Sequence, residues 1–241
     1  MERFIKLMRA YQLLLELYEV DAMMAVATSA MREATNGAEL VHTVKLNTGL
    51  EINIIDGEEE ADMINDAIYS YITKGPALHI DVGGGSTELN LYLNHRKIRS
   101  VSFAIGSVRR IEVADTPETW SDIKKWIKRH VTKDYAQITA LGTGGNINKL
   151  YEITAGRHNL GKTKSMTLDQ ARDTYQYLQG FSTEELESGL QLNADRADVI
   201  IPASEIYLNI MKWAGANTIR VPDVGLKDGI MQHLYRSNLI E

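Results

Sequence analysis

The sequence predicts an α/β protein, and three observations lead to this class. Short, almost uninterrupted apolar runs such as residues 22–27 are typical of strands covered on both faces of a parallel sheet. Amphipathic segments with apolar residues three and four apart lie between these runs and predict helices. Glycine-rich turns follow two of the runs directly, at residues 82–86 and 142–145. Strands that alternate with helices in this way predict an α/β architecture.

The composition is that of an ordinary globular protein with one large domain or two small ones. The chain has 241 residues, of which 44% are hydrophobic and 24% charged, and this excludes intrinsic disorder. It contains no cysteine, which excludes disulfides, a thiolate zinc site and a thiol nucleophile. A chain without cysteine fits a reducing compartment, so we expect a cytoplasmic protein.

The charge balance restricts the partners. With 26 basic and 32 acidic residues the net charge is −6, so the long-range field repels nucleic acid and anionic membranes. We therefore expect no nucleic-acid and no membrane partner, and a polyanionic ligand must be held by local donors. No apolar run approaches the length of a membrane span, and the first residues begin an amphipathic pattern rather than a signal peptide.

The first third of the chain predicts a helical region with two strands. Apolar spacing predicts a helix with one buried face over residues 2–19. A helix capped by Thr28 or Ser29 is expected to stop at Asn36-Gly37. The remaining elements expected here are a strand at 22–27, a short helix at 41–46, a strand at 50–55 and a helix at 58–72.

After Gly75-Pro76 the pattern changes to a β-meander followed by helices. The meander is predicted from the strands 77–81, 88–93 and 98–104. Further strands are expected at 137–141 and 218–221. Helices are expected at 107–113, 117–131, 167–179, 183–188, 195–213 and 225–234, and one begins at the glycines 142–145.

The first glycine turn has the features of a phosphate loop. Gly83, Gly84 and Gly85 leave backbone N–H groups unobstructed by side chains, which suits phosphate oxygens. Asp81 at the strand end adds an oxygen ligand for Mg²⁺, Ser86 adds a hydroxyl, and Glu88 returns to the same face. The alternative is a plain glycine hairpin, and the flanking acid and hydroxyl groups favour phosphate over it.

A second glycine cluster, Gly142-Thr-Gly-Gly145, again follows a strand and precedes a helix. Its N–H groups and the helix dipole make an anion site, which includes Gly144 and Gly145. Its spacing does not reach the dinucleotide fingerprint G-x-G-x-x-G. Two such turns in one chain are a more specific signal than either alone.

Residues 156–163 match the Walker A pattern by letter, but we reject that interpretation. A P-loop needs a buried strand before its first glycine, whereas residues 149–154 are half polar. A newly capped helix begins only at Thr167. The alternative is a basic surface loop with Arg157, His158, Lys162 and Lys164.

Glu58, Glu59 and Glu60 begin the helix that follows an Asp-Gly turn. Acidic residues in the first turn usually stabilise the helix dipole, which accounts for the first two. A carboxylate that faces a phosphate loop can act as a general base. Arg32 can clamp a phosphate oxygen, although a lone arginine on a helix is more often solvated. His79 is expected in a strand interior, and the six histidines show no metal-ligand spacing.

These motifs together resemble the exopolyphosphatase and guanosine pentaphosphate phosphatase (Ppx/GppA) family of the actin-like ATPase superfamily. The resemblance runs nearly end to end, and its carriers are residues 27–34, 57–61, 81–89, 142–145, 196–203 and 223–226. It implies a phosphoanhydride hydrolase that releases terminal phosphate from polyphosphate or guanosine pentaphosphate with Mg²⁺. It also implies the site residues: Glu60 as the catalytic carboxylate, Arg32, Gly83, Gly84, Gly85, Ser86, Gly144 and Gly145 as phosphate-binding residues, and Asp81 and Glu88 as metal ligands.

The resemblance further implies a two-lobed ribonuclease-H-like fold with an incomplete first lobe. Residues 1–62 would be a remnant of the N-terminal lobe, on which helix 226–240 is expected to pack, and residues 63–225 would form the second lobe. Family members begin with a strand-loop-strand that carries another phosphate loop, and nothing here matches it. We therefore expect a truncated product with weak or absent turnover, an exposed apolar face and self-association as a homodimer.

Two other functions stay open at this stage. The chain could be a nonhydrolytic module that binds a phosphorylated ligand, which binding without phosphate release would favour, or a truncated inactive fragment. A kinase of the same superfamily would need an adenosine pocket near residues 142–145. The sequence does not choose between polyphosphate and the guanosine nucleotide.

Overall fold

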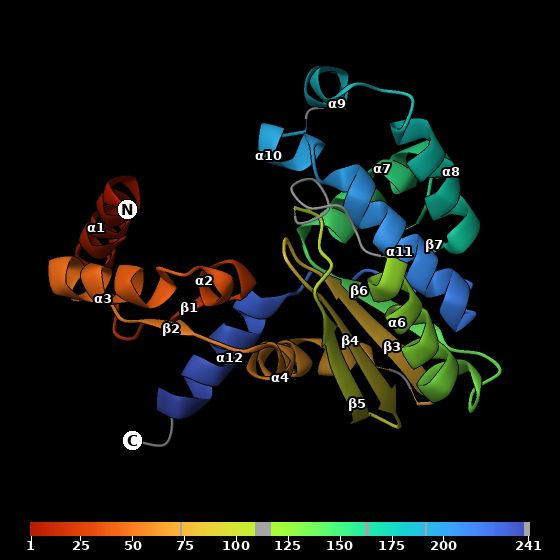
Figure 1. The fold of residues 1–241 in the computed structure, drawn as a ribbon, viewed down its shortest axis with the longest axis horizontal. Coiled ribbons are helices and arrows are strands. Elements are labelled where there is room, and N and C mark those ends of the chain that lie inside the picture. Colours follow the sequence, from red (N-terminus) through yellow and green to blue (C-terminus); the bar gives the residue numbers. More distant parts are fainter. Residues whose placement is uncertain (73, 109–116, 162–163, 191, 239–241) are drawn as a thin grey trace. The chain divides into compact units, whose positions relative to one another are not determined.

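The computed structural model describes residues 1–72, 74–108, 117–161, 164–190 and 192–238, and the chain divides into two compact units. Unit 1 contains residues 1–67 and 226–241, and unit 2 contains residues 68–225. The helix predicted at 107–113 falls mostly outside the described residues. Figure 1 shows the elements in sequence colours.

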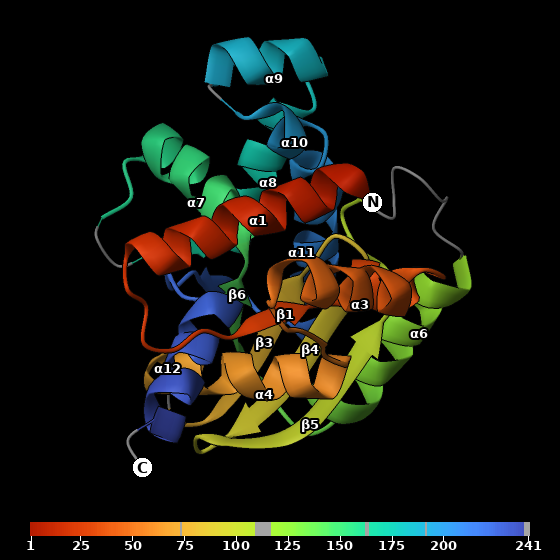
Figure 2. The same ribbon diagram turned by 90° about the vertical axis from the view of Figure 1, so that its left-hand side faces the viewer.

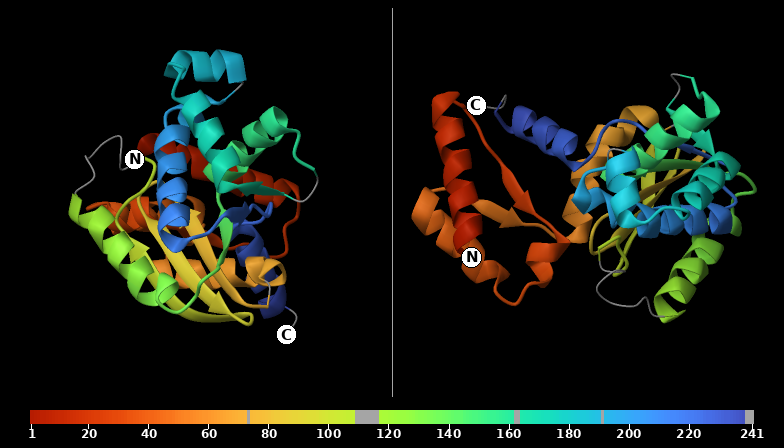
Figure 3. Two further views of the ribbon diagram at one scale, coloured as in Figure 1. Left: turned by 90° about the vertical axis from the view of Figure 1, so that its right-hand side faces the viewer. Right: turned by 90° about the horizontal axis from the view of Figure 1, so that it is seen from above.

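Unit 1 consists of helices around a two-stranded parallel sheet. The strands are β1 (Ala25–Ala27) and β2 (Ile52–Ile54), which lie side by side in Figure 3. The helices are α1 (Glu2–Leu17), α2 (Ser29–Glu33), α3 (Gly37–Thr48), α4 (Gly57–Ile68) and α12 (Leu226–Asn238). Helix α1 contacts α3, as Figure 2 shows, and a small core of Val44, Leu50 and Ile52 lies between helices and strands.

Burial in unit 1 is shallower than predicted. The strand expected over residues 22–27 is only three residues long, and all three are half-exposed rather than covered on both faces. Helix α1 forms as predicted and packs the face of Phe4, Ile5, Met8 and Leu15 against the small core, but buries none of its residues completely. The physical reason is the same in both cases: a two-stranded sheet and one helix contact provide too little surface to cover these elements.

The turn at Gly37 also differs from its prediction. Asn36-Gly37 does not stop a helix; Gly37 is the first residue of α3, which replaces the short helix expected at 41–46. A side chain at this position would collide with the carbonyl oxygen of Met31, so only glycine lets α2 and α3 approach so closely. The glycine that does end a helix here is Gly49, whose φ of 72° lies in the left-handed region.

Unit 2 is built on a six-stranded sheet in the order β5-β4-β3-β6-β8-β7. The strands are β3 (Pro76–Val82), β4 (Thr87–Leu93), β5 (Arg96–Phe103), β6 (Thr139–Thr143), β7 (Ser165–Thr167) and β8 (Thr218–Arg220). The antiparallel meander β3-β4-β5 is confirmed, and β6 and β8 continue the sheet in parallel. This is a ribonuclease-H-like strand order, as expected. Strand β7 was not predicted.

The helices of unit 2 contact one another beside the sheet (Figures 1 and 3). They are α6 (Pro117–Ile127), the π-helical segment η2 (Lys128–Thr132), α7 (Gly145–His158), α8 (Leu168–Leu178), α9 (Thr183–Leu190), α10 (Ala194–Ala197) and α11 (Ile200–Ala214), and a 3-10 turn η1 (Tyr69–Tyr71) precedes the sheet. Helix α11 buries nine residues and contacts α6, α7 and α8. The helix predicted at 195–213 is therefore two helices. None of the helices in the described residues is both long and apolar enough to cross a membrane.

Candidate phosphate-handling site

Two carboxylates face each other where β3 and β4 meet. Asp81 and Glu88 are directly opposite in the antiparallel register, which places side chains within about 5 Å at Cβ. Glu88 is buried, and the Ser102 hydroxyl donates to its Oε1 at 2.9 Å. Burial, and then the charge of Glu88, raise the pKa of Asp81 to about 7, against a weaker opposite effect of its hydrogen bond with Thr143. A buried carboxylate opposite a second, partly exposed one is costly unless a proton or a cation neutralises one of the charges.

This donor set fits a hard divalent cation. Carboxylate oxygens are what Mg²⁺ prefers, and it commonly binds through one or two carboxylates while waters and substrate phosphates complete its coordination. Within the described residues no cluster of three or more His, Cys, Asp or Glu forms a complete protein cage. Asp81 and Glu88 would therefore hold such an ion only together with water or a phosphorylated ligand.

The first glycine turn connects these two strands and is fixed by its own backbone. The N–H of Gly83 donates to the Ser86 carbonyl at 2.9 Å, so it serves the turn and not an outside phosphate. The carbonyls of Gly83 and Gly84 accept from the N–H groups of Ser107 and Val108 at 3.0 and 2.9 Å. These two hydrogen bonds fix the turn against the chain that follows β5.

The second glycine turn lies beside the first. Gly144 is the N-cap of α7 with φ 103°, and a Cβ there would lie 3.0 Å from Oδ1 of Asp81. Gly145 begins α7, and its Cα faces the guanidinium of Arg196. The amino end of this 14-residue helix therefore opens next to the Asp81–Glu88 pair, where its dipole favours an anion.

Side chains connect the two glycine turns. Asn146 of α7 donates to the Ser107 hydroxyl at 3.3 Å, and that hydroxyl donates to the Gly83 carbonyl at 3.3 Å. Tyr207 of α11 donates to the Thr143 carbonyl at 2.6 Å and accepts from the Val82 N–H at 3.1 Å. Burial and the charge of Asp81 raise the pKa of Tyr207, which keeps its phenol protonated and able to donate.

A buried chain of hydrogen bonds ends at Asp81. The Ser100 hydroxyl donates to Oδ1 of Asn90 at 2.7 Å, so the Asn90 amide nitrogen faces Nδ1 of His79 at 3.2 Å. Nδ1 must therefore accept, and Nε2 carries the ring proton toward Oγ1 of Thr143 at 2.8 Å. The Thr143 hydroxyl can then donate to Asp81, with which it shares a hydrogen bond. His79 lies in the strand interior as predicted, and burial lowers its pKa to about 3.

Unit 1 holds the other two predicted residues at the carboxyl ends of β1 and β2. The Arg32 guanidinium donates to the Ile55 carbonyl at 2.7 Å, which fixes it beside the end of β2. Asp56 caps α4: its Oδ1 accepts from the N–H groups of Glu58 and Glu59, and Glu59 Oε2 accepts from the Asp56 N–H. Glu59 lies in the first turn of α4, where its charge was expected to stabilise the helix dipole, and it also accepts from the Asp56 N–H, while Glu60 is half-buried one position later.

The structure therefore brings the predicted residues together in two groups. Asp81, Glu88 and the glycine turns 83–86 and 144–145 form one group in unit 2, and Arg32 and Glu60 belong to unit 1. Sequence reasoning missed Gly106, Ser107, Thr143 and Tyr207. Of these, only Thr143 lies in a recognisable motif, G-T-G-G. The other three reach the site through contacts between residues far apart in the sequence.

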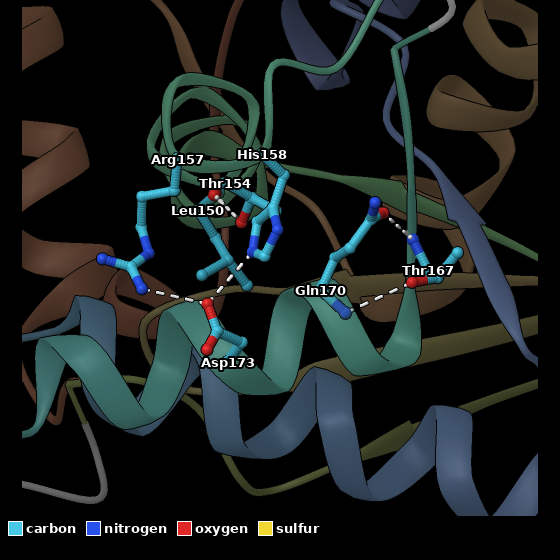
Figure 4. Close-up of polar contacts among 7 residues, drawn as sticks. All are labelled: Leu150, Thr154, Arg157, His158, Thr167, Gln170 and Asp173. Carbon is cyan, nitrogen blue, oxygen red and sulfur yellow. Dashed lines mark hydrogen bonds and ion pairs between the residues drawn. The ribbon is translucent and has the colours of Figure 1, made fainter.

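The described residues of the Walker A match do not have the surroundings of a P-loop, in agreement with the rejection of that interpretation. Residues 145–158 are helix α7, so no strand precedes Gly156, and residues 162–163 lie outside the described part. The prediction that Arg157 and His158 lie in a basic surface loop is wrong, because both residues belong to helix α7. Figure 4 shows both side chains directed at Asp173 of α8, each at 3.0 Å, and Arg157 also lies 3.9 Å from the centre of the Tyr177 ring. Their role is to join α7 to α8.

The sheet order defines the chain as a ribonuclease-H-like α/β protein whose two glycine turns lie at the carboxyl ends of parallel strands. Comparison with known families makes the assignment more specific. The model of the Ppx/GppA phosphatase family matches residues 1–238, and the chain belongs to this family.

Relatives with described names are distant in sequence and longer. Guanosine-5'-triphosphate,3'-diphosphate pyrophosphatase of Aeromonas hydrophila is 26% identical over 99% of this chain and 50% of its own length. Exopolyphosphatase 1 of Mycobacterium tuberculosis is 20% identical over 87% of this chain and 66% of its own. A bifunctional 3-dehydroquinate synthase/phosphatase of Fusobacterium nucleatum is 25% identical over 92% and 36%. The chain spans between about one third and two thirds of these relatives.

Solved structures of the family have the same fold. The Ppx/GppA family member of Aquifex aeolicus superposes with a TM-score of 0.74 at 25% identity, covering 98% of this chain and 82% of that one. An exopolyphosphatase from Cytophaga hutchinsonii gives a TM-score of 0.81 at 21% identity with the same two coverages. The second likeness concerns the fold alone.

Proposed function

We propose that the chain is a phosphoanhydride hydrolase that releases the terminal phosphate of inorganic polyphosphate or the 5′ phosphate of guanosine pentaphosphate. The observation that carries the proposal is the opposed pair Asp81 and Glu88 beside two glycine turns. Related proteins are named for both substrates.

In this proposal the residues of unit 2 bind the terminal phosphate. The Gly84 N–H, the Ser86 hydroxyl and the amino end of α7 at Gly144 and Gly145 would donate to its oxygens. Gly83 and Gly85 would keep side chains away from the phosphate. Asp81 and Glu88 would hold Mg²⁺, which when bound supplies positive charge to the phosphate oxygens. Thr143 and His79 would fix the orientation of the Asp81 carboxylate through their hydrogen bonds.

The residues of unit 1 would act on the attacking water and on the phosphate oxygens. Glu60 would accept a proton from a water that attacks in line with the leaving phosphate, and Arg32 would bind an oxygen of the transferred group. Glu60 belongs to unit 1 and the glycine turn 83–86 to unit 2, so their joint action on one phosphate is part of the proposal.

The test is Glu60→Gln with Glu58→Gln as matched control. Both substitutions remove one charge from the first turn of α4, but Glu58 is exposed and Glu60 half-buried. We expect Glu60→Gln to lower phosphate release by about 10²- to 10⁴-fold, the usual contribution of a general base, while calorimetry still detects substrate binding. Glu58→Gln should release phosphate at the parent rate. Full turnover by Glu60→Gln would contradict the assignment.

A further inference from the structure

A cationic surface lies on unit 2, on the segment that α6 and η2 form together. Its members are Lys125, Lys128, Arg129 and Lys133, and with Thr132 they line a hollow of about 490 Å³. We call these four cations the α6–η2 cationic face. They occur at helical spacing, and the other side of the same segment, Ile123, Ile127 and Val131, is fully buried.

The charges on this face are poorly compensated nearby. Between Asp122, which pairs with Lys125 at 3.0 Å, and Asp134, which follows the last cation, the sequence has no acidic residue. The structure shows no ion pair for Lys128, Arg129 or Lys133 with any described residue. A chain of net charge −6 therefore carries a local positive surface, which an ordinary solvated helix face with mixed charges would not produce.

Arg99 of the edge strand β5 adds a further positive charge near η2. His130 of η2 has its pKa lowered first by burial and then by the charges of Arg129 and Arg99, against a smaller opposite effect of Asp134. Arg99 is thus close enough for its charge to act on η2.

The topology places this region at the sheet end opposite to the glycine turns. Arg96 pairs with Leu93, which is opposite Pro76 at the start of β3, and η2 leads into β6, whose Thr139 pairs with Ala77. The glycine turns follow the other ends of β3 and β6. The cationic face is therefore a surface separate from the candidate site.

We infer that the α6–η2 cationic face binds the distal part of an inorganic polyphosphate chain whose terminal phosphate is at the candidate site. The inference rests on the proposed function and selects polyphosphate as its substrate class. The two sites lie at opposite ends of the seven-residue strand β3, roughly 20 Å apart, a span that a polymer of many phosphates can cover and that we expect a guanosine pentaphosphate not to cover. Holding the polymer at a second place raises its effective concentration at the first.

Single-stranded nucleic acid carries a similar backbone but fits this surface less well. Its binding proteins combine cations with exposed aromatic rings on which bases stack. The two tryptophans of this segment, Trp120 and Trp126, both pack against the core, and the Trp126 ring also lies against the His130 ring, with centroids 5.3 Å apart. The face offers flexible lysines and no exposed ring within the described residues, which suits phosphates without bases.

The test compares Lys128→Gln/Arg129→Gln/Lys133→Gln with a control of equal charge change, Lys6→Gln/Arg9→Gln/Lys227→Gln, whose sites are exposed and lie in unit 1. Binding of polyphosphate of about 100 phosphates is measured with EDTA present over a range of salt, so that no turnover is needed. We expect at least about tenfold weaker binding for the first variant, and a plot of log affinity against log salt that is flatter by about 2, from three contacts at about 0.7 each. The control should bind like the parent chain.

Three further measurements make the result decisive. Tripolyphosphate hydrolysis should be the same in both variants, because a short substrate does not reach the face. Parent-like affinity and salt dependence in the first variant would overturn the inference, and equally tight binding of poly(U) RNA that competes with polyphosphate would assign the face to nucleic acid instead. Absence of phosphate release from the parent chain, with these binding differences intact, would overturn the proposed hydrolysis and leave the binding surface standing.

Discussion

At the scale of single residues, the geometry of the site requires glycine at position 144. Its φ of 103° is strained for any other residue, and a methyl group there would lie 3.0 Å from a carboxylate oxygen of Asp81. Gly156 lies inside α7 with nothing within 4 Å of an added methyl group. The two glycines of one helix therefore make different predictions.

We expect Gly144→Ala to destabilise the protein by about 1–3 kcal/mol and to reduce phosphate release. Gly156→Ala should instead stabilise it by about 0.5–1 kcal/mol, because glycine in a helix interior costs that much relative to alanine. Urea denaturation and a phosphate-release assay on both variants check this. Equal stability changes of the same sign would show that the turn at Gly144 is not as tight as described.

His79 predicts a pH dependence of stability. Its folded pKa of about 3 lies below its unfolded value of 6.5, so below pH 6.5 the unfolded state binds more protons than the folded one. This contribution to the free energy of unfolding is complete above pH 6.5 and falls with pH, by up to about 1.4 kcal/mol per pH unit. Asp81, whose folded pKa is raised, acts in the opposite sense over much of this range.

The comparison with His79→Gln isolates the histidine. The difference in free energy of unfolding between parent and variant should shrink as the pH falls from 6.5 toward 4, in urea titrations with EDTA. If the variant does not fold, NMR of the parent imidazole gives the answer, since its ring should stay neutral down to pH 5. A ring that titrates near 6.5 would rule out the buried hydrogen-bond chain.

At the scale of elements, the Asp56 cap fixes the first turn of α4, and this turn contains Glu60. The Asp56 carboxylate accepts from two N–H groups of the first turn, and the Asp56 N–H donates to the Glu59 carboxylate. We expect Asp56→Ala to lower the free energy of unfolding by about 0.5–2 kcal/mol, the usual cost of losing an N-cap, while Asp56→Asn retains most of it. Denaturation curves for the pair check this. Similar losses in both variants would mean that the carboxylate contributes by its charge and not by these bonds.

The sequence predicted unit 2 better than unit 1 for a physical reason. Strand β4 is buried along nearly its whole length and the glycine turns bound it, so its apolar run and its ends were readable within a residue. Alternation along the strands also placed Asp81 and Glu88 on one face, and the register confirms it. In unit 1 the apolar run at 22–27 predicted a covering that two short strands do not provide.

Long-range contacts explain what remained hidden at the site. The hydrogen bond between Tyr207 and the Thr143 carbonyl joins residues 64 apart, and no local pattern marks Tyr207 as the partner of the G-T-G-G motif. Gly106 was not noticed, although a side chain there would collide with the carbonyl of Gly84. Glycine is thus required at position 106 because the backbone of a turn more than twenty residues away packs against it.

At the scale of the whole molecule, the apolar surface of α1 predicts self-association. Leu13, Leu17 and Tyr18 are 64%, 73% and 75% exposed, and the helix buries no residue. Large exposed apolar side chains that lie together on one element commonly mark an interaction surface. We propose a homodimer or larger assembly that uses this helix.

Sedimentation velocity at several concentrations checks the proposal with Leu13→Gln/Leu17→Gln. We expect this variant to shift toward monomer, with folding stability nearly unchanged because both sites are exposed. Arg3→Gln, on the same helix and also exposed, serves as the control. Identical concentration dependence in all three proteins would exclude α1 as the contact.

The two separate stretches of chain that make up unit 1 have a consequence for dissecting the protein. Helix α12 contacts α4 so closely that a side chain at Gly229 would overlap the Met63 carbonyl, and Arg236 donates to Asp66 at 2.6 Å. Unit 2 is in effect an insertion between α4 and α12. A fragment that stops at residue 67 lacks the helix that completes it, so shortening the tail should damage the beginning of the chain first, whereas residues 68–225 are continuous and offer the natural fragment for separate expression.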